Sequence, residues 1–169
     1  MTSDVATRSS FRKVPIAYQL ARIASLAALS VLGSFIHPFP SAVPTVALDS
    51  APGFFAALYF GPLDGFCVLG IGHVATAIIN GLPLGILHAP IALGLAIAGW
   101  LMGLINRKWN FLPAVAVGVA INTGLVVLAI PVLGLDATLA FTPILFLASI
   151  VNAAAGALVY LGVKRRLKT

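Results

Sequence analysis

The sequence contains very few charged residues. Of its 169 residues, 60% are hydrophobic and only 8% are charged, whereas a typical soluble domain carries about 25% charged residues. A chain of this composition could not cover a folded surface with polar side chains. Apolar runs of about 20 residues recur along the whole length, and a membrane-spanning helix needs a run of about that length. The composition therefore excludes an ordinary soluble protein and predicts an all-α polytopic membrane protein, with residues 1–169 as a single integral-membrane domain.

The sequence also lacks the residues on which several kinds of chemistry depend. Cys67 is its single cysteine, which excludes an internal disulfide and a thiolate metal cluster, and we expect this side chain to be a small buried hydrophobe. No Walker A, G-x-S-x-G or H-E-x-x-H motif occurs, which argues against ATP hydrolysis by this chain, a serine hydrolase and a zinc protease. The three histidines have no cysteine or glutamate nearby, so we predict no metal site, no bound cofactor and no enzymatic activity.

The ten basic residues of the chain lie next to its apolar runs. They fall near the N-terminus, at residues 107–108 and in the C-terminal sequence KRRLKT. Basic groups in such flanking positions follow the positive-inside rule and do not form a face for phosphates. We therefore expect a lipid bilayer and no nucleic acid as partner. We also expect a short cytoplasmic N-terminal tail at about 1–13 and a basic C-terminal tail at about 164–169.

Six apolar segments are predicted to be helices, at about 16–36, 50–61, 62–80, 84–105, 113–133 and 143–163. The second is short for a bilayer of about 30 Å, and it could instead join the third as one kinked span. Six spans place both termini and the basic loop on one side of the membrane, whereas five would separate the two basic ends, which the positive-inside rule disfavours. We therefore predict six transmembrane helices with both termini cytoplasmic, the first being an uncleaved span and not a signal peptide.

Eight of the polar residues on or beside these helices are candidates for a binding site, namely Asp49, Ser50, His73, Thr76, Asn80, His88, Asn122 and Asn152. His73, Thr76 and Asn80 have the spacing i, i+3, i+7 and so share one helix face. Polar groups at this depth need hydrogen-bond partners, because hydrocarbon offers none. We expect the eight residues to line a substrate pocket open to the outside. They could instead only bond neighbouring helices, and for Asn122 and Asn152 both interpretations stand equally.

The first apolar run carries a stripe of small residues with 4-3-4 spacing, namely Ala17, Ala21, Ala24 and Ala28. Small side chains let another helix approach closely, either a helix of the same chain or one of a separate membrane partner. Arg22 is expected to reach the membrane interface without a chemical role. We expect Asp64 to stabilise a helix N-terminus, a role that Asp49 could also have, and His37 to be a loop residue.

The stretch VALDSAPGFFAALYFGPLDG at residues 46–65 resembles the loop, short second helix and Gly-Pro turn of the substrate-binding S components of energy-coupling factor (ECF) vitamin transporters. The alanine stripe is similar to the surface by which those proteins dock onto the transmembrane coupling subunit. The resemblance implies a subunit of the prokaryotic cytoplasmic membrane that captures a vitamin or vitamin precursor from outside. It also implies that two ATPase partner subunits use the ATP.

Within that family, ALDSAPGFFAALYFGP together with GHVATAIINGLPLG looks most like the branch for α-ribazole, a nucleoside precursor of cobalamin. On that resemblance Asp49, His73, Asn80 and His88 would hold the ribose and the base edges. The N-terminal MTSDVATRSS lacks the Met-His motif of the cobalt and nickel branch. The alternatives are an S component for another vitamin such as riboflavin or thiamine, a membrane assembly protein without a ligand, and an intramembrane enzyme acting on lipid head groups.

Overall fold

The computed structural model describes residues 15–37 and 47–166, and every regular element within them is a helix. The elements are α1 (Ile16–Gly33), α2 (Ala51–Tyr59), α3 (Pro62–Ile79), η1 (Gly85–Leu87), α4 (His88–Lys108), α5 (Phe111–Gly124), η2 (Leu125–Ala129), α6 (Ile130–Leu133) and α7 (Leu135–Arg166). The predicted tail at 1–13, the end of the basic C-terminal tail and most of the loop before α2 lie outside the described residues.

Five helical segments of the described chain are long and apolar enough to cross a membrane: α1, α3, Gly85–Lys108, Phe111–Leu133 and α7. This confirms the prediction of an all-α, multi-pass membrane protein. With nine residues, α2 is about 14 Å long and covers only part of a bilayer. The count of six complete spans therefore stays a prediction.

The chain reverses its direction between α2 and α3, so the two helices are not one kinked span. Gly61 has a φ of 112°, a conformation that favours glycine, and forms this turn. Beyond the turn Gly65 packs against Ala57 and Leu69 against Gly53, which is the order of two antiparallel helices. By contrast, α1 and α3 run in parallel, because Arg22 contacts Asp64 nearer the start of both helices and Ser30 faces Gly72 further along both.

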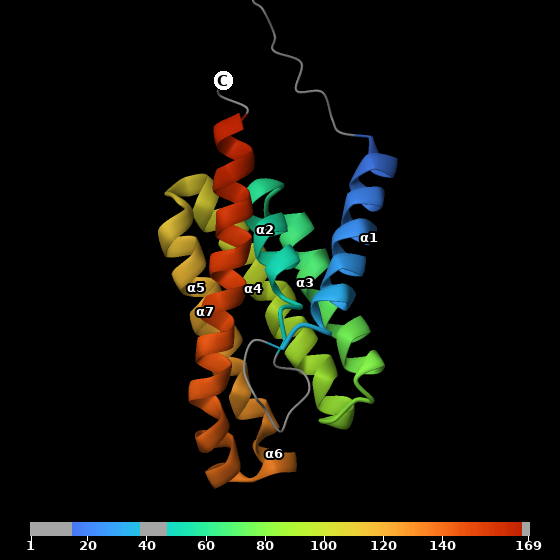
Figure 1. Cartoon of the computed structure of the whole chain (residues 1–169), viewed down its shortest axis with the longest axis vertical. Coiled ribbons are helices and arrows are strands. Elements are labelled where there is room, and N and C mark those ends of the chain that lie inside the picture. Colours follow the sequence, from blue (N-terminus) through green and yellow to red (C-terminus); the bar gives the residue numbers. More distant parts are fainter. Residues whose placement is uncertain (1–14, 38–46, 167–169) are drawn as a thin grey trace, which may run out of the picture.

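The bundle is organised around the short helix α2. Figure 1 shows α2 beside α1 and α3, while α7 runs the full length of the bundle and α6 lies at the end opposite the start of α1. The ring of Phe54, which is fully buried, packs with Met102 in the main apolar core. Gly118 and Gly156 make this possible, because a Cβ atom on either would approach Phe54 to less than 3.0 Å. The helix α1 begins and α7 ends at the same end of the bundle (Figure 1), an arrangement that termini on one side of a membrane require.

The largest differences from the predicted helices lie in the last two segments, and each of these contains a proline. The last helix was expected to begin at Pro143 but begins at Leu135, with Pro143 inside it. Proline in a helix removes one backbone hydrogen bond, and membrane helices tolerate it where side chains or neighbouring helices re-satisfy the freed groups. The predicted helix at 113–133 is divided into α5, η2 and α6, and Pro131 lies in the first turn of α6.

Candidate functional site

A single cavity brings together residues that are far apart in the sequence. It lies at the N-terminal end of α2, between α3, α4, α5, η2, α6 and α7, and its interior is about 60 Å³. Six of the eight residues predicted to bind substrate line it, namely Asp49, Ser50, His73, His88, Asn122 and Asn152. Ser149 adds a seventh polar side chain, and the rest of the wall is apolar. This volume holds about four or five water molecules, so a larger ligand must move the lining side chains as it enters.

Asn152 anchors the segment before α2 to the middle of α7. Its Oδ1 accepts a hydrogen bond from the Ser50 backbone N–H at 3.0 Å, and its Nδ2 donates to the carbonyl oxygens of Ala47 at 2.8 Å and Ala148 at 3.0 Å. Both donors and one acceptor site of the amide are therefore used within the protein. Of the two roles left open for Asn152, these hydrogen bonds correspond to the structural role of joining two parts of the chain. They also position Asp49 and Ser50 in the cavity wall.

Asn122 on α5 is oriented by Ser149 on α7. The Ser149 Oγ donates its hydrogen to the Leu145 carbonyl oxygen at 2.8 Å, so it can only accept from Asn122. The group that faces it at 2.9 Å is therefore the amide Nδ2 of Asn122. The carbonyl oxygen of that amide accepts no hydrogen bond from any described residue, which leaves an acceptor at the cavity wall.

His73 on α3 and His88 at the start of α4 form a hydrogen-bonded pair. The His73 Nε2 and His88 Nδ1 atoms are 3.1 Å apart, and the other ring nitrogen of His88 accepts from the backbone N–H of Leu84 at 3.3 Å. In a neutral imidazole one nitrogen donates and the other accepts. The Leu84 amide therefore places the His88 hydrogen on Nδ1, which donates to His73 Nε2. The two rings thus share one defined arrangement of protons.

Asp49 is the carboxyl group of the cavity. It lies between α1 and α2 and is almost fully buried, and Ser50 Oγ donates to its Oδ1 at 3.3 Å. Burial raises the pKa of Asp49 from 3.8 to about 7, although hydrogen bonds from Ser50 and the backbone, together with the charge of His37, act in the opposite direction. The carboxyl group therefore titrates near neutral pH.

Thr76 and Asn80 lie outside the cavity although they share a helix face with His73. Gly72 packs against Ser30 of α1, and Thr76, one turn further along α3, is completely buried with its Oγ1 unpaired among the described residues. The Asn80 Nδ2 donates to the carbonyl oxygen of Thr76 at 3.0 Å and so caps the end of its own helix. Residues on this face of α3 therefore contact two different helices: His73 contacts α4, whereas the neighbouring positions pack toward α1.

The alanine stripe of α1 points away from the bundle. Ala17, Ala21, Ala24 and Ala28 are all exposed. The buried face of α1 consists instead of Ile23, Ala27, Ser30 and Gly33. In the described part of the chain the stripe therefore packs against no other helix of the protein, and its small side chains are available to a membrane partner.

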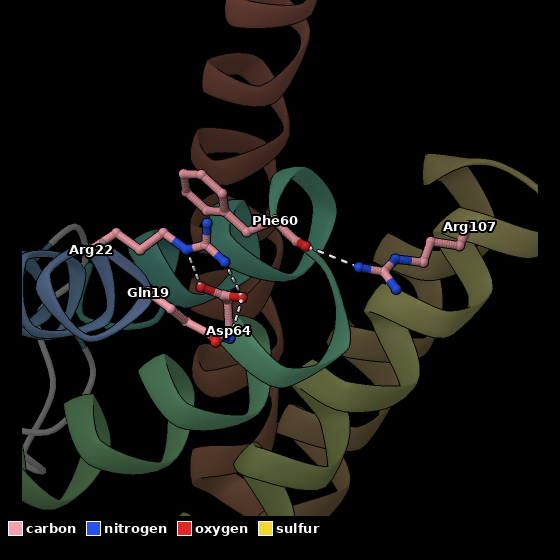
Figure 2. A network of polar contacts seen from close by, with 5 residues as sticks. All are labelled: Gln19, Arg22, Phe60, Asp64 and Arg107. Carbon is pink, nitrogen blue, oxygen red and sulfur yellow. Dashed lines mark hydrogen bonds and ion pairs between the residues drawn. The ribbon is translucent and has the colours of Figure 1, made fainter. Parts of the chain in front are cut away.

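An ion pair that the sequence did not reveal joins the half-buried Arg22 of α1 to the buried Asp64 of α3 (Figure 2). The Arg22 guanidinium donates to both carboxylate oxygens of Asp64, the Nη2–Oδ2 distance being 2.8 Å, and Gln19 donates to the same carboxylate. Arg22 also lies 4.5 Å from the ring centroid of Phe60, whose carbonyl oxygen accepts from Arg107 at 3.1 Å. Arg22 was expected to reach the membrane interface, which stays a prediction; the structure adds that it pairs with Asp64, because a buried carboxylate needs a partner.

The remaining expectations concern Asp64, Cys67 and a metal site. Asp64 lies in the first turn of α3, as expected, whereas Cys67 is half-buried instead of fully buried. Among the residues that the structure describes, no group of three His, Cys, Asp or Glu side chains could hold a metal ion.

Together these features define a multi-pass membrane protein with a polar-lined internal cavity and an exposed small-residue helix face. The family model for the substrate-specific component of ECF transporters matches residues 18–164, and the chain belongs to this family. Comparison with curated proteins and with solved structures gives no match. Membership identifies a membrane-embedded, substrate-specific subunit of an ECF transporter and not an enzyme. Such components bind small molecules and work with transmembrane and ATPase modules.

Proposed function

We propose that this chain captures a vitamin or vitamin precursor from outside the prokaryotic cytoplasmic membrane and delivers it to an ECF coupling module. The observation that carries the proposal is the cavity, in which polar side chains from the segment before α2 and from α3, α4, α5 and α7 meet in an otherwise apolar bundle. Polar and ionisable groups are costly at this depth and are usually kept there for function.

The proposed orientation has six passes and both termini in the cytoplasm. Arg107 and Lys108 at the end of α4, and Lys164 to Arg166 at the end of α7, lie at the end of the bundle where α1 begins. Basic groups favour the cytoplasmic side of a membrane. The cavity lies toward the opposite end, which is then the outer one.

The proposed ligand is α-ribazole, with other vitamins such as riboflavin or thiamine as the alternatives. Asp49, His73, His88 and Asn122 are the residues proposed to contact it, since Asn152 is occupied by the backbone around α2. A nucleoside offers hydroxyl and ring groups that these side chains can hydrogen-bond. Thr76 and Asn80 are assigned supporting roles in α3.

Ligand-dependent stabilisation of the purified protein tests this proposal. A ligand that binds only the folded state raises the free energy of unfolding, by about 2.7 kcal/mol at one hundred times its Kd. We expect a rise in Tm with α-ribazole, and a loss of at least about tenfold in affinity when Asn122→Leu removes the unpaired carbonyl. Ser25→Ala, at an exposed position of α1, is the control. If none of α-ribazole, riboflavin and thiamine raises the Tm, the alternative of a membrane assembly protein without a ligand is favoured.

The alanine stripe is the proposed docking surface for the transmembrane coupling subunit, which works with two ATPase subunits. Close helix approach requires small side chains, so Ala21→Leu and Ala24→Leu should abolish co-purification with the coupling subunit. Ala116→Leu, at an exposed position of α5, is the matched control and should leave the complex intact. If both sets of variants behave alike, docking uses another surface.

A further inference from the structure

The cavity has an uneven balance of charge. Asp49 provides a carboxyl group, whereas no lysine or arginine is among the described residues that line the cavity. The preceding segment 38–46, PFPSAVPTV, has no charged residue either. Arg22 is engaged with Asp64 (Figure 2), and His37 is the other titratable group whose charge acts on Asp49.

The two cavity histidines supply no positive charge in the observed arrangement. A proton on His88 Nε2 would face the Leu84 N–H, which needs an acceptor there. A proton on His73 Nε2 would face the hydrogen on His88 Nδ1. Either addition breaks a hydrogen bond that the neutral pair makes, so the geometry fits two neutral rings.

The hydrogen-bonding capacity that remains for a ligand includes two acceptors. Asn152 uses its amide on Ala47, Ser50 and Ala148, and Ser149 Oγ donates to Leu145 while it accepts from Asn122 and Thr123. The pairing with His88 leaves a donor on His73 Nδ1, and the acceptors that remain are the Asp49 carboxyl group and the carbonyl oxygen of Asn122. An acceptor without a protein partner, such as the carbonyl oxygen of the half-buried Asn122, gains most from a ligand that donates a hydrogen bond to it.

We infer that the cavity selects ligands that carry no negative charge and that donate hydrogen bonds to Asp49 and Asn122. This inference rests on the proposed function, and it narrows the substrate class to neutral or cationic compounds with N–H or O–H groups. An anionic carboxylate or phosphate would lie beside the Asp49 carboxylate with no lysine or arginine among the described lining residues, and a like charge at short range in a buried site is strongly unfavourable.

Matched pairs of compounds that differ by one negative group test the inference. The probes are α-ribazole and its 5′-phosphate, riboflavin and its 5′-phosphate, thiamine and its monophosphate, and nicotinamide and nicotinate. Binding to the purified full-length protein is measured by thermal shift and calorimetry at pH 8. We expect at least one neutral or cationic member to bind, and its anionic counterpart to bind at least about tenfold more weakly.

The Asp49→Asn variant identifies the source of this selectivity. It should bring the Kd values of such a pair to within about threefold of each other, because the like charge is removed. The control Ser25→Ala should leave their ratio unchanged. Equal or tighter binding of the anionic member to the natural chain overturns the inference and leaves vitamin capture standing. If neither the neutral or cationic compounds nor their anionic counterparts bind, both the inferred charge selectivity and the proposed vitamin capture are overturned.

Discussion

Replacing Asp49 by asparagine should change how the stability of the protein depends on pH. Burial raises the pKa of this carboxyl from 3.8 to about 7. Between these pH values the folded protein holds a proton on Asp49 that the unfolded chain has lost, so the free energy of unfolding falls as the pH rises. The interval spans about three pH units at about 1.4 kcal/mol each, or about 4 kcal/mol in total. Above about pH 7 both states are ionised and the loss is complete.

The assay is unfolding of the detergent-purified protein, followed from pH 4 to pH 9, for the natural chain and for Asp49→Asn. Asparagine keeps an oxygen that can accept from Ser50 Oγ but has no titrating proton. The variant should equal the natural chain near pH 4 and exceed it by about 4 kcal/mol at pH 8. Because His73 and His88 are present in both proteins, their titrations cancel in the difference between the curves, which leaves Asp49 together with its coupling to His37. Two parallel curves over this range would refute the reasoning.

The other predictions concern single contacts, each measured by unfolding in detergent. Arg22→Ala should cost about 3–5 kcal/mol, because it leaves Asp64 buried without its counter-charge, and the double variant with Asp64→Leu should recover most of that loss. Asn152→Leu should cost about 2–4 kcal/mol by leaving backbone groups around α2 unpaired, and a neutral result would deny it the anchoring role. Thr76→Val should be neutral or should stabilise by about 1–2 kcal/mol, because its hydroxyl is buried without a partner, and ligand affinity should not change.

The helices could be predicted from the sequence because the bilayer core offers no water to the backbone. A long apolar run within it must therefore satisfy its own backbone hydrogen bonds, which a helix does. The start of α7 could not, since Pro143 is a usual first-turn residue but here lies within the helix. Helix boundaries at prolines depend on the neighbouring helices, which the sequence of one segment does not specify.

The cavity was predictable in part, because polar side chains within apolar runs are rare enough to mark it. Ser149 was missed because a serine in a membrane helix ordinarily bonds its own backbone, which it also does here. The Arg22–Asp64 pair was missed for a different reason. Its partners are 42 residues apart, and only the register of α1 against α3, fixed by contacts such as that of Ser30 with Gly72, brings them together.

The unequal lengths of the helices have a consequence for the surrounding lipid. The 32 residues of α7 extend over about 48 Å, whereas the 18 residues of α1 extend over about 27 Å. A flat hydrocarbon layer of about 30 Å cannot match both, so α7 must tilt or project while the layer adjusts beside α1. Lipids with longer or shorter acyl chains will therefore favour different inclinations of the bundle, and acyl-chain length becomes a variable to control in any uptake measurement on reconstituted protein.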